Sequence, residues 1–117
     1  MKIKTSELTG AQLDWAVAKC DHPEQYDYEN GGVWVNAEAG ERFQPSTDWA
    51  QGGPIIEREK IDVFWQSITG SFVGSAARGR KVGWRHLQYG PTPLIAAMRC
   101  YVASKLGDEV EVPEGLK

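Results

Sequence analysis

The sequence predicts a small α+β protein in which a short antiparallel sheet has two main helices packed on it. Two segments with apolar residues at helical spacing, residues 9–20 and 93–106, predict the helices. Segments rich in β-branched and aromatic residues predict strands at 33–35 and 84–89, and an alternating segment predicts a further edge strand at 108–112.

Length and composition narrow the class of protein. The chain has 117 residues, 41% of them hydrophobic and 25% charged, which predicts one globular domain over 1–117 and excludes collagen-like and wholly disordered chains. No apolar run approaches the roughly 18 residues that a membrane span needs. The start, MKIKTSELTG, has no apolar stretch and so is not a secretory signal. We therefore expect a soluble protein in the cytoplasm, with no membrane partner.

The first helix has the start signals of a capped helix. Thr9 is a suitable N-cap and Gln12 stands three residues later, which is the spacing of a capping box. Leu8 and Leu13 occupy the positions of a hydrophobic staple around that start. These signals predict that the helix begins at residue 9.

The last helix has signals at both ends. Thr92 is an N-cap candidate, and Pro93 stands at the first helical position, where its missing N–H is not needed. Gly107 follows the last apolar residue and is a typical helix stop. Because 93–106 is mostly apolar, we expect this helix to be the core element.

Glycine, proline and polar residues predict loops over 21–32, 36–54 and 67–83, with one turn of helix allowed in the second. The segment IIEREKIDVFW mixes two periods and predicts a short helix over 55–60 followed by a strand over 61–65.

Charge is unevenly distributed along the chain. Residues 1–62 carry 6 basic and 12 acidic side chains, whereas residues 63–107 carry 6 basic and no acidic ones. Four of the basic residues fall in the segment ARGRKVGWR. Such a cluster attracts anions, although pairing with acids elsewhere in the fold explains it equally well. The overall pI of 5.4 argues against a nucleic-acid partner.

Three blocks of sequence resemble a known family. They are KIKTSELTGAQLDWAVAKC, STDWAQGGPIIERE and YGPTPLIAAMRCYVASKLGDEVEVP, which together make up about half of the chain. They resemble the NinX-like accessory proteins of lambdoid phages and prophages. The resemblance implies a phage protein that acts inside a bacterial cell, and it assigns no activity to particular residues.

Catalytic and metal motifs are weak. Cys20-Asp21-His22 lacks the further ligands of a zinc site, so we expect no metal or cofactor. Cys20 and Cys100 are expected to be reduced and to pack as small hydrophobic residues. Gly74 to Gly79 has the first spacing of a Walker loop, but Arg80 and Lys81 follow where that motif needs Lys and then Ser or Thr.

No nucleophile with a base and an orienting group is recognisable either. His86 has no marked serine partner, and Glu57 and Glu59 alternate with basic residues as on a solvated, self-paired face. An enzyme is therefore the weaker prediction.

The parts of a nucleotide site are present instead. They are basic side chains that can grip phosphate, aromatic rings that can stack on bases, glycines that admit close approach, and the helix start at residue 92. Trp65 adds to the supply of rings, and Trp49 is expected in the loop 46–54. The candidate ligand-binding residues are Trp49, Gln51, Gly52, Gly53, Arg78, Arg80, Lys81, Trp84, Arg85, Tyr89 and Thr92.

This combination favours binding without turnover. For a phage protein in the cytoplasm of its bacterial host, it predicts sequestration of an anionic nucleotide-type small molecule, such as a cyclic nucleotide or ADP-ribose derivative made in anti-phage defence. The chain is expected to form a homo-oligomer, since sites on small proteins often lie at symmetric interfaces. Two alternatives stay open: a protein-interaction module that inhibits a host protein, and a small nucleotide hydrolase.

Overall fold

The computed structural model describes residues 1–21, 26–29, 32–35, 41–76, 87–114 and 116. It confirms the α+β class with antiparallel strands. The elements in chain order are β1 Lys2–Lys4, the short 3-10 helix η1 Thr5–Glu7, α1 Gly10–Asp21, β2 Tyr26–Glu29, β3 Gly32–Val35, β4 Glu41–Arg42, α2 Trp49–Glu59, β5 Asp62–Gln66, β6 Ser71–Ser75, β7 Gln88–Gly90, α3 Pro93–Leu106 and β8 Glu109–Glu111.

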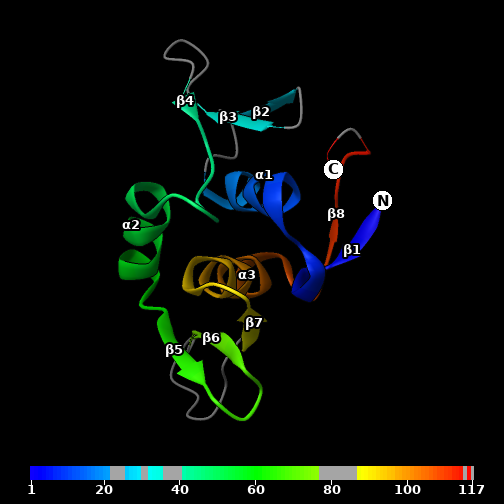
Figure 1. Cartoon of the computed structure of the whole chain (residues 1–117). Coiled ribbons are helices and arrows are strands. Elements are labelled where there is room, and N and C mark those ends of the chain that lie inside the picture. Colours follow the sequence, from blue (N-terminus) through cyan, green and yellow to red (C-terminus); the bar gives the residue numbers. More distant parts are fainter. Residues whose placement is uncertain (22–25, 30–31, 36–40, 77–86, 115, 117) are drawn as a thin grey trace.

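The strands of the described residues form three small antiparallel sheets, ordered β1-β8, β2-β3-β4 and β5-β6-β7. Figure 1 shows α1 between the β2-β3-β4 sheet and α3, with the β5-β6-β7 sheet on the other side of α3 and α2 along the flank. The pairing of β1 with β8 sets Lys2 opposite Glu111 and holds the two ends of the chain side by side.

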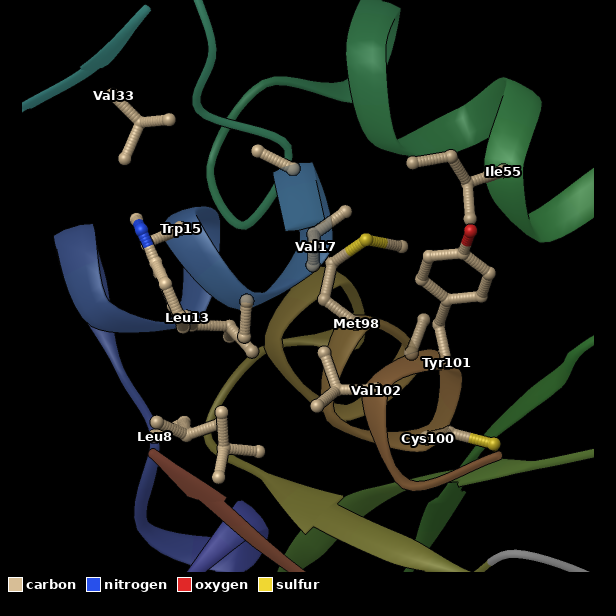
Figure 2. Close-up of a cluster of buried hydrophobic side chains, with 14 of the residues drawn as sticks. Leu8, Leu13, Trp15, Val17, Val33, Ile55, Met98, Cys100, Tyr101 and Val102 are labelled. Carbon is tan, nitrogen blue, oxygen red and sulfur yellow. The ribbon is translucent and has the colours of Figure 1, made fainter. Parts of the chain in front are cut away.

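Helix α3 is the centre of the core, as its composition predicts. Its buried side chains include Met98, Cys100 and Val102, and Figure 2 shows Met98 and Val102 on the side of α3 that faces Leu13 and Val17 of α1. Cys100 lies on the side of β6, because a Cβ on Gly74 would be 3.0 Å from its Cβ. A helix that is apolar on nearly every side is stable only when other elements cover it on several sides. Helices α1 and α2, the short helix η1 and the β5-β6-β7 sheet provide that cover.

Two glycines bring the β5-β6-β7 sheet onto α3. A Cβ on Gly74 would lie 2.5 Å from the carbonyl oxygen of Ala96, and one on Gly90 would lie 2.7 Å from the nitrogen of Ala96. No side chain fits in such a space, so these glycines set the distance between sheet and helix. The glycines and serines of residues 67–83 predict a loop. That prediction is wrong for Ser71–Ser75, because this segment is strand β6.

The predicted loop over 46–54 is wrong from Trp49 on, because helix α2 begins at Trp49 and ends at Glu59, and the short helix expected over 55–60 is the second half of α2. Asp48 is its N-cap, and the carboxylate accepts a hydrogen bond from the N–H of Ala50 at 2.9 Å. Lys60 ends the helix in the left-handed region at φ 53°. The strand expected at 61–65 is confirmed as β5.

The predicted loop over 21–32 is wrong for Tyr26–Glu29, which form β2 and pair with β3. Strand β4 and strand β1 also have no counterpart in the prediction. The expected strand over 84–89 appears as β7 from residue 88, and residues 84–86 lie outside the described part. The strands expected at 33–35 and 108–112 are confirmed as β3 and β8.

Both ends of α3 agree with the sequence signals, whereas the start of α1 differs in the role of Gln12. The side chain of Thr92 accepts a hydrogen bond from the N–H of Ile95 at 3.1 Å, and Gly107 ends α3 at φ 89°. Helix α1 starts at Gly10, and the side-chain amide of Gln12 donates to the carbonyl of Leu116 at 3.3 Å. Gln12 thus ties the first turn to the C-terminal segment.

Candidate functional site

The candidate residues that the structure describes lie on three elements. Trp49, Gln51, Gly52 and Gly53 are in the first half of α2, Tyr89 is on β7, and Thr92 caps α3. The other candidates, Arg78, Arg80, Lys81, Trp84 and Arg85, lie outside the described residues.

The first turns of α2 and α3 are in direct contact. A Cβ on Gly52 would lie 2.6 Å from Cδ2 of Leu94 and 2.5 Å from the carbonyl oxygen of Pro45. At their other ends the helices are joined by an ion pair between Glu59 and Lys105 at 3.3 Å. The first turns of the two helices, and with them their N-termini, therefore lie close together. Each N-terminus carries a partial positive charge.

Both helix starts are already capped by their own side chains. Asp48 caps α2 through Ala50, and Thr92 caps α3 through Ile95. The role of Thr92 in the described structure is thus the local one, that of a helix cap. The carboxylate of Asp48 also offsets part of the positive charge at the start of α2.

The side chain of Gln51 links α2 to the segment that follows β4. Its side-chain oxygen accepts a hydrogen bond from the N–H of Gln44 at 2.6 Å, and its nitrogen donates to the carbonyl of Arg42 at 2.8 Å. These bonds fix the connection between β4 and α2. Gly52 likewise serves close packing, so the described contacts give both residues a structural role.

The candidates that remain open to solvent are Trp49, Gly53 and Tyr89. Trp49 is 57% exposed and Tyr89 is 41% exposed. A Cβ on Gly53 would meet nothing within 4 Å. A large aromatic side chain that stays exposed at the first residue of a helix contributes little to the core, which leaves it available to a ligand.

A cation lies beside Tyr89. The guanidinium of Arg99 donates from Nη1 to the carbonyl of Tyr89 at 2.7 Å and from Nε to the carbonyl of Leu8 at 2.8 Å. Burial lowers the pKa of Arg99. Among the described residues no carboxylate forms an ion pair with this guanidinium, so its charge is balanced only by carbonyl dipoles.

Phe64 was missed by sequence reasoning, although it lies on the same sheet as Tyr89. The register pairs Phe64 with Val73 and Val73 with Tyr89, so the three side chains form one row across β5, β6 and β7. Phe64 is 44% exposed. Its exposure depends on which face of β5 meets α3, which the strand sequence alone does not give.

Asp14 is a buried carboxylate that binds the segment leading into α2. The carboxylate of Asp14, on α1, accepts a hydrogen bond from the N–H of Ser46 at 2.9 Å, inside the protein. Burial raises the pKa of Asp14 to about 6, even though the hydrogen bond from the Ser46 N–H and the charge of Arg42 act in the opposite direction. Asp14 thus holds the connector that leads into Asp48 and α2.

The two cysteines are free thiols. Burial raises the pKa of Cys20 to about 11 and that of Cys100 to about 12, so neither is a thiolate near neutral pH. The self-paired charges predicted at the end of α2 are also seen, since Arg58 contacts Glu59 at 3.1 Å and Asp21 at 2.7 Å. In the described ranges, no three His, Cys, Asp or Glu residues are grouped so that they could hold a metal ion.

Fold and site together describe a small α+β protein with exposed aromatic rings beside two helix starts. No helix of the described structure is long and apolar enough to cross a membrane. The chain belongs to the NinX family of bacteriophage P22, whose family model matches residues 4–105. It is thus a phage accessory protein, as the three sequence blocks indicated. No curated protein matches the chain.

Proposed function

We propose that this NinX-family protein binds an anionic nucleotide-type ligand without converting it. In the cytoplasm of the bacterial host, such binding would remove a signal of anti-phage defence, such as a cyclic nucleotide or an ADP-ribose derivative. The observation that supports the proposal is the contact between Gly52 and Leu94, by which the first turn of α2, with exposed Trp49, lies next to the capped start of α3.

The charge of this region supports an anionic ligand. Helix α3 and strand β7 belong to the stretch 63–107, which contains six basic residues and no acidic one. Arg99 has only carbonyl partners among the described residues. A nearby phosphate would gain from the cation and from the two helix starts, and would compete with the carboxylate of Asp48.

The rings support a nucleotide rather than a simple anion. A base that stacks on an aromatic side chain gains about 1–3 kcal/mol, measured by alanine substitution. Both rings are exposed. Trp49 is the first residue of α2, and Tyr89 lies on β7, just before the start of α3. The proposal takes these two rings as ligand contacts and takes Gln51, Gly52 and Thr92 as the residues that hold them in place.

The described side chains favour binding over turnover. Both thiols have raised pKa values and are therefore poor nucleophiles. Asp14, whose pKa is suited to proton transfer, is buried and bonded to the backbone of Ser46, away from solvent. A small nucleotide hydrolase is the alternative that a change in ligand mass would reveal.

The test is a thermal-shift titration of the purified protein with ADP-ribose, cyclic ADP-ribose, a cyclic dinucleotide and a cyclic trinucleotide. The proposal expects a saturable rise in Tm with at least one compound, and a much smaller rise for Trp49→Ala. Glu114→Gln is the control, because Glu114 is exposed and lies outside both α2 and the β5-β6-β7 sheet. If no compound raises Tm, the proposal is wrong for these ligands.

One observation favours the second candidate, a protein-interaction module. Trp65 is 57% exposed, and with Ile68 it gives the β5–β6 hairpin an apolar tip. Exposed apolar side chains that are grouped together often mark a protein contact. The partner of this candidate is a host protein, and its capture from host lysate by wild type but not by Ile68→Ala would support it.

A further inference from the structure

Strand β5 forms one edge of the β5-β6-β7 sheet, and in the described structure no strand pairs with its outer side. Two of its aromatic side chains are exposed, Trp65 by 57% and Phe64 by 44%. The outer side of an edge strand presents backbone N–H and C=O groups with which another strand can pair. The sheet can therefore be extended at β5.

The hydrogen bond of Arg99 shows which backbone groups of the sheet face which way. The carbonyl of Tyr89, on β7, accepts this bond from Nη1 of Arg99 at 2.7 Å. This carbonyl therefore points away from β6, and Tyr89 and Val73 are a pair without hydrogen bonds to each other. The backbone groups of Val73 point instead to β5, where its paired residue is Phe64.

The outward backbone groups of β5 are consequently those of Val63 and Trp65. Phe64 is bonded to β6, and its two neighbours along the strand point the opposite way. In the described part of the chain, no hydrogen bond from outside the sheet reaches the backbone of Val63 or Trp65. Two N–H and two C=O groups thus lie along the outer side of β5.

The other edge strands of the described structure are protected against pairing. Charged side chains and short length both discourage a further strand. Strands β4 and β7 have two and three residues. The remaining edges have two charged residues each: Lys2 and Lys4 on β1, Asp27 and Glu29 on β2, and Glu109 and Glu111 on β8. Strand β5 has five residues, and its one charged residue is Asp62 at the start.

The sequence of β5 is complementary to itself in antiparallel register. When Phe64 of one copy lies opposite Phe64 of another, Val63 lies opposite Trp65 and Asp62 opposite Gln66. Apolar residues then pair with apolar residues, and the carboxylate is opposite an amide, so no like charges meet. Val63 and Trp65 become the hydrogen-bonded pairs, which satisfies the outward groups of both copies.

We propose that two copies of the chain associate through β5 and join their sheets into one antiparallel sheet, with a two-fold axis at Phe64. In this kind of association, main-chain hydrogen bonds provide affinity and the side chains provide specificity. The ring of Trp65, which contacts Phe72 at 5.0 Å in one copy, gains Val63 of the second copy as a neighbour. The inference does not depend on the proposed function, because β5 contributes neither of the proposed ligand contacts.

The first test is the molar mass in solution, measured by light scattering after gel filtration over a range of protein concentrations. Wild type is expected to rise from the 13.0 kDa of one chain toward twice that value. Phe64→Lys places two like charges directly opposite and should stay monomeric. Ile68→Lys adds the same charge in the β5–β6 turn, outside the paired residues, and should dimerise as wild type does.

A mixture of two variants separates lost pairing from lost folding. Phe64→Glu alone should also be monomeric, because two carboxylates would then be opposite each other. An equimolar mixture of Phe64→Lys and Phe64→Glu should recover the dimer, since opposite charges now meet across the axis. Unfolded variants could not be rescued in this way, and Tm reports the folding of each variant directly.

Disulfide formation tests the register. In a pair without mutual hydrogen bonds, the two Cα atoms are about 4.5 Å apart, within the roughly 4.4–6.8 Å found in disulfides. Phe64→Cys should therefore give a crosslinked dimer on mild oxidation. Gln66→Cys is the matched control on the same strand, because the two copies of this residue would be roughly 13 Å apart along the strands. Wild type, with Cys20 and Cys100, gives the background.

Three results would overturn the proposal. The first is a wild-type molar mass of one chain at every concentration. The second is a dimer that Phe64→Lys leaves intact, because the contact would then lie elsewhere. The third is crosslinking of Gln66→Cys as fast as that of Phe64→Cys, because the strands would then not be paired around Phe64.

Discussion

Gly52 of α2 lies against Leu94 of α3 so closely that a Cβ on the glycine would be 2.6 Å from Cδ2 of Leu94. The same Cβ would be 2.5 Å from the carbonyl oxygen of Pro45, which is backbone and cannot rotate away. This contact sets the position of α2 and therefore of Trp49 at its start. The account of the site depends on it.

Gly52→Ala is predicted to destabilise the protein by about 1–3 kcal/mol, because the added methyl group forces the backbone of α2 away from Pro45. Urea unfolding followed by circular dichroism measures the free energy of unfolding.

Gly53→Ala is the matched control, one residue further along the same helix. A Cβ at Gly53 meets nothing within 4 Å, and alanine is the better helix former by about 0.5–1 kcal/mol. The prediction is therefore a small gain in stability. If both alanine variants have the same stability, the close contact at Gly52 is not important for the position of α2.

The buried carboxyl of Asp14 predicts a pH dependence of stability. Its pKa is raised by burial to about 6, whereas an aspartate in the unfolded chain titrates near 3.9. The native state holds this proton more tightly, so the contribution of Asp14 to stability is present below about pH 4 and is lost as the pH rises through 6. A shift of this size corresponds to about 3 kcal/mol.

Asp14→Asn removes that titration and can still accept the hydrogen bond from Ser46. The variant should therefore gain stability relative to wild type between pH 4 and pH 7, measured as the difference in free energy of unfolding at each pH. Glu114→Gln, at an exposed position, is the control. A difference between Asp14→Asn and wild type that is the same at both pH values would contradict the account.

Thr92 is predicted to act through its cap. Thr92→Ala removes the oxygen that accepts from Ile95 and should cost about 1 kcal/mol of stability. Thr92→Ser keeps the oxygen and should remain close to wild type. Equal stability of the two variants, measured by denaturant unfolding, would mean that the cap does not stabilise α3.

The elements predicted correctly have local signals in the sequence. Helix α3 could be placed to within a residue because Thr92, Pro93 and Gly107 act through nearby backbone groups. Asp48 was available as a cap for α2, but Gly52, Gly53 and Pro54 together are typical of a loop. The helix forms there because Gly52 and Ile55 pack inside the protein, and such contacts between distant segments are not visible in local sequence.

The missed strands show the same limit. Strand β6 contains Gly74, which predicted a loop, yet a glycine is required there by the backbone of Ala96. Strand β2 could have been found, since Asn30-Gly31 lies between the paired residues Glu29 and Gly32 and is the usual residue pair of a tight hairpin.

The candidate site was predicted in part. Sequence identified Trp49 and Tyr89 as rings for a ligand, and both are exposed. It could not show that the amide of Gln51 is used by Gln44 and Arg42, because those contacts depend on the path between β4 and α2. Nor could it show that Phe64 shares a sheet face with Tyr89, since that needs the register of three strands.

The central claim is that the protein binds a nucleotide-type ligand and leaves it intact. The most direct measurement incubates excess protein with ADP-ribose, cyclic ADP-ribose or a cyclic oligonucleotide, removes free compound by filtration, and analyses what heat denaturation releases by mass spectrometry. The account predicts that at least one compound is retained in proportion to the protein and is released with its mass unchanged. Release of a compound of altered mass, or retention of none, would contradict it.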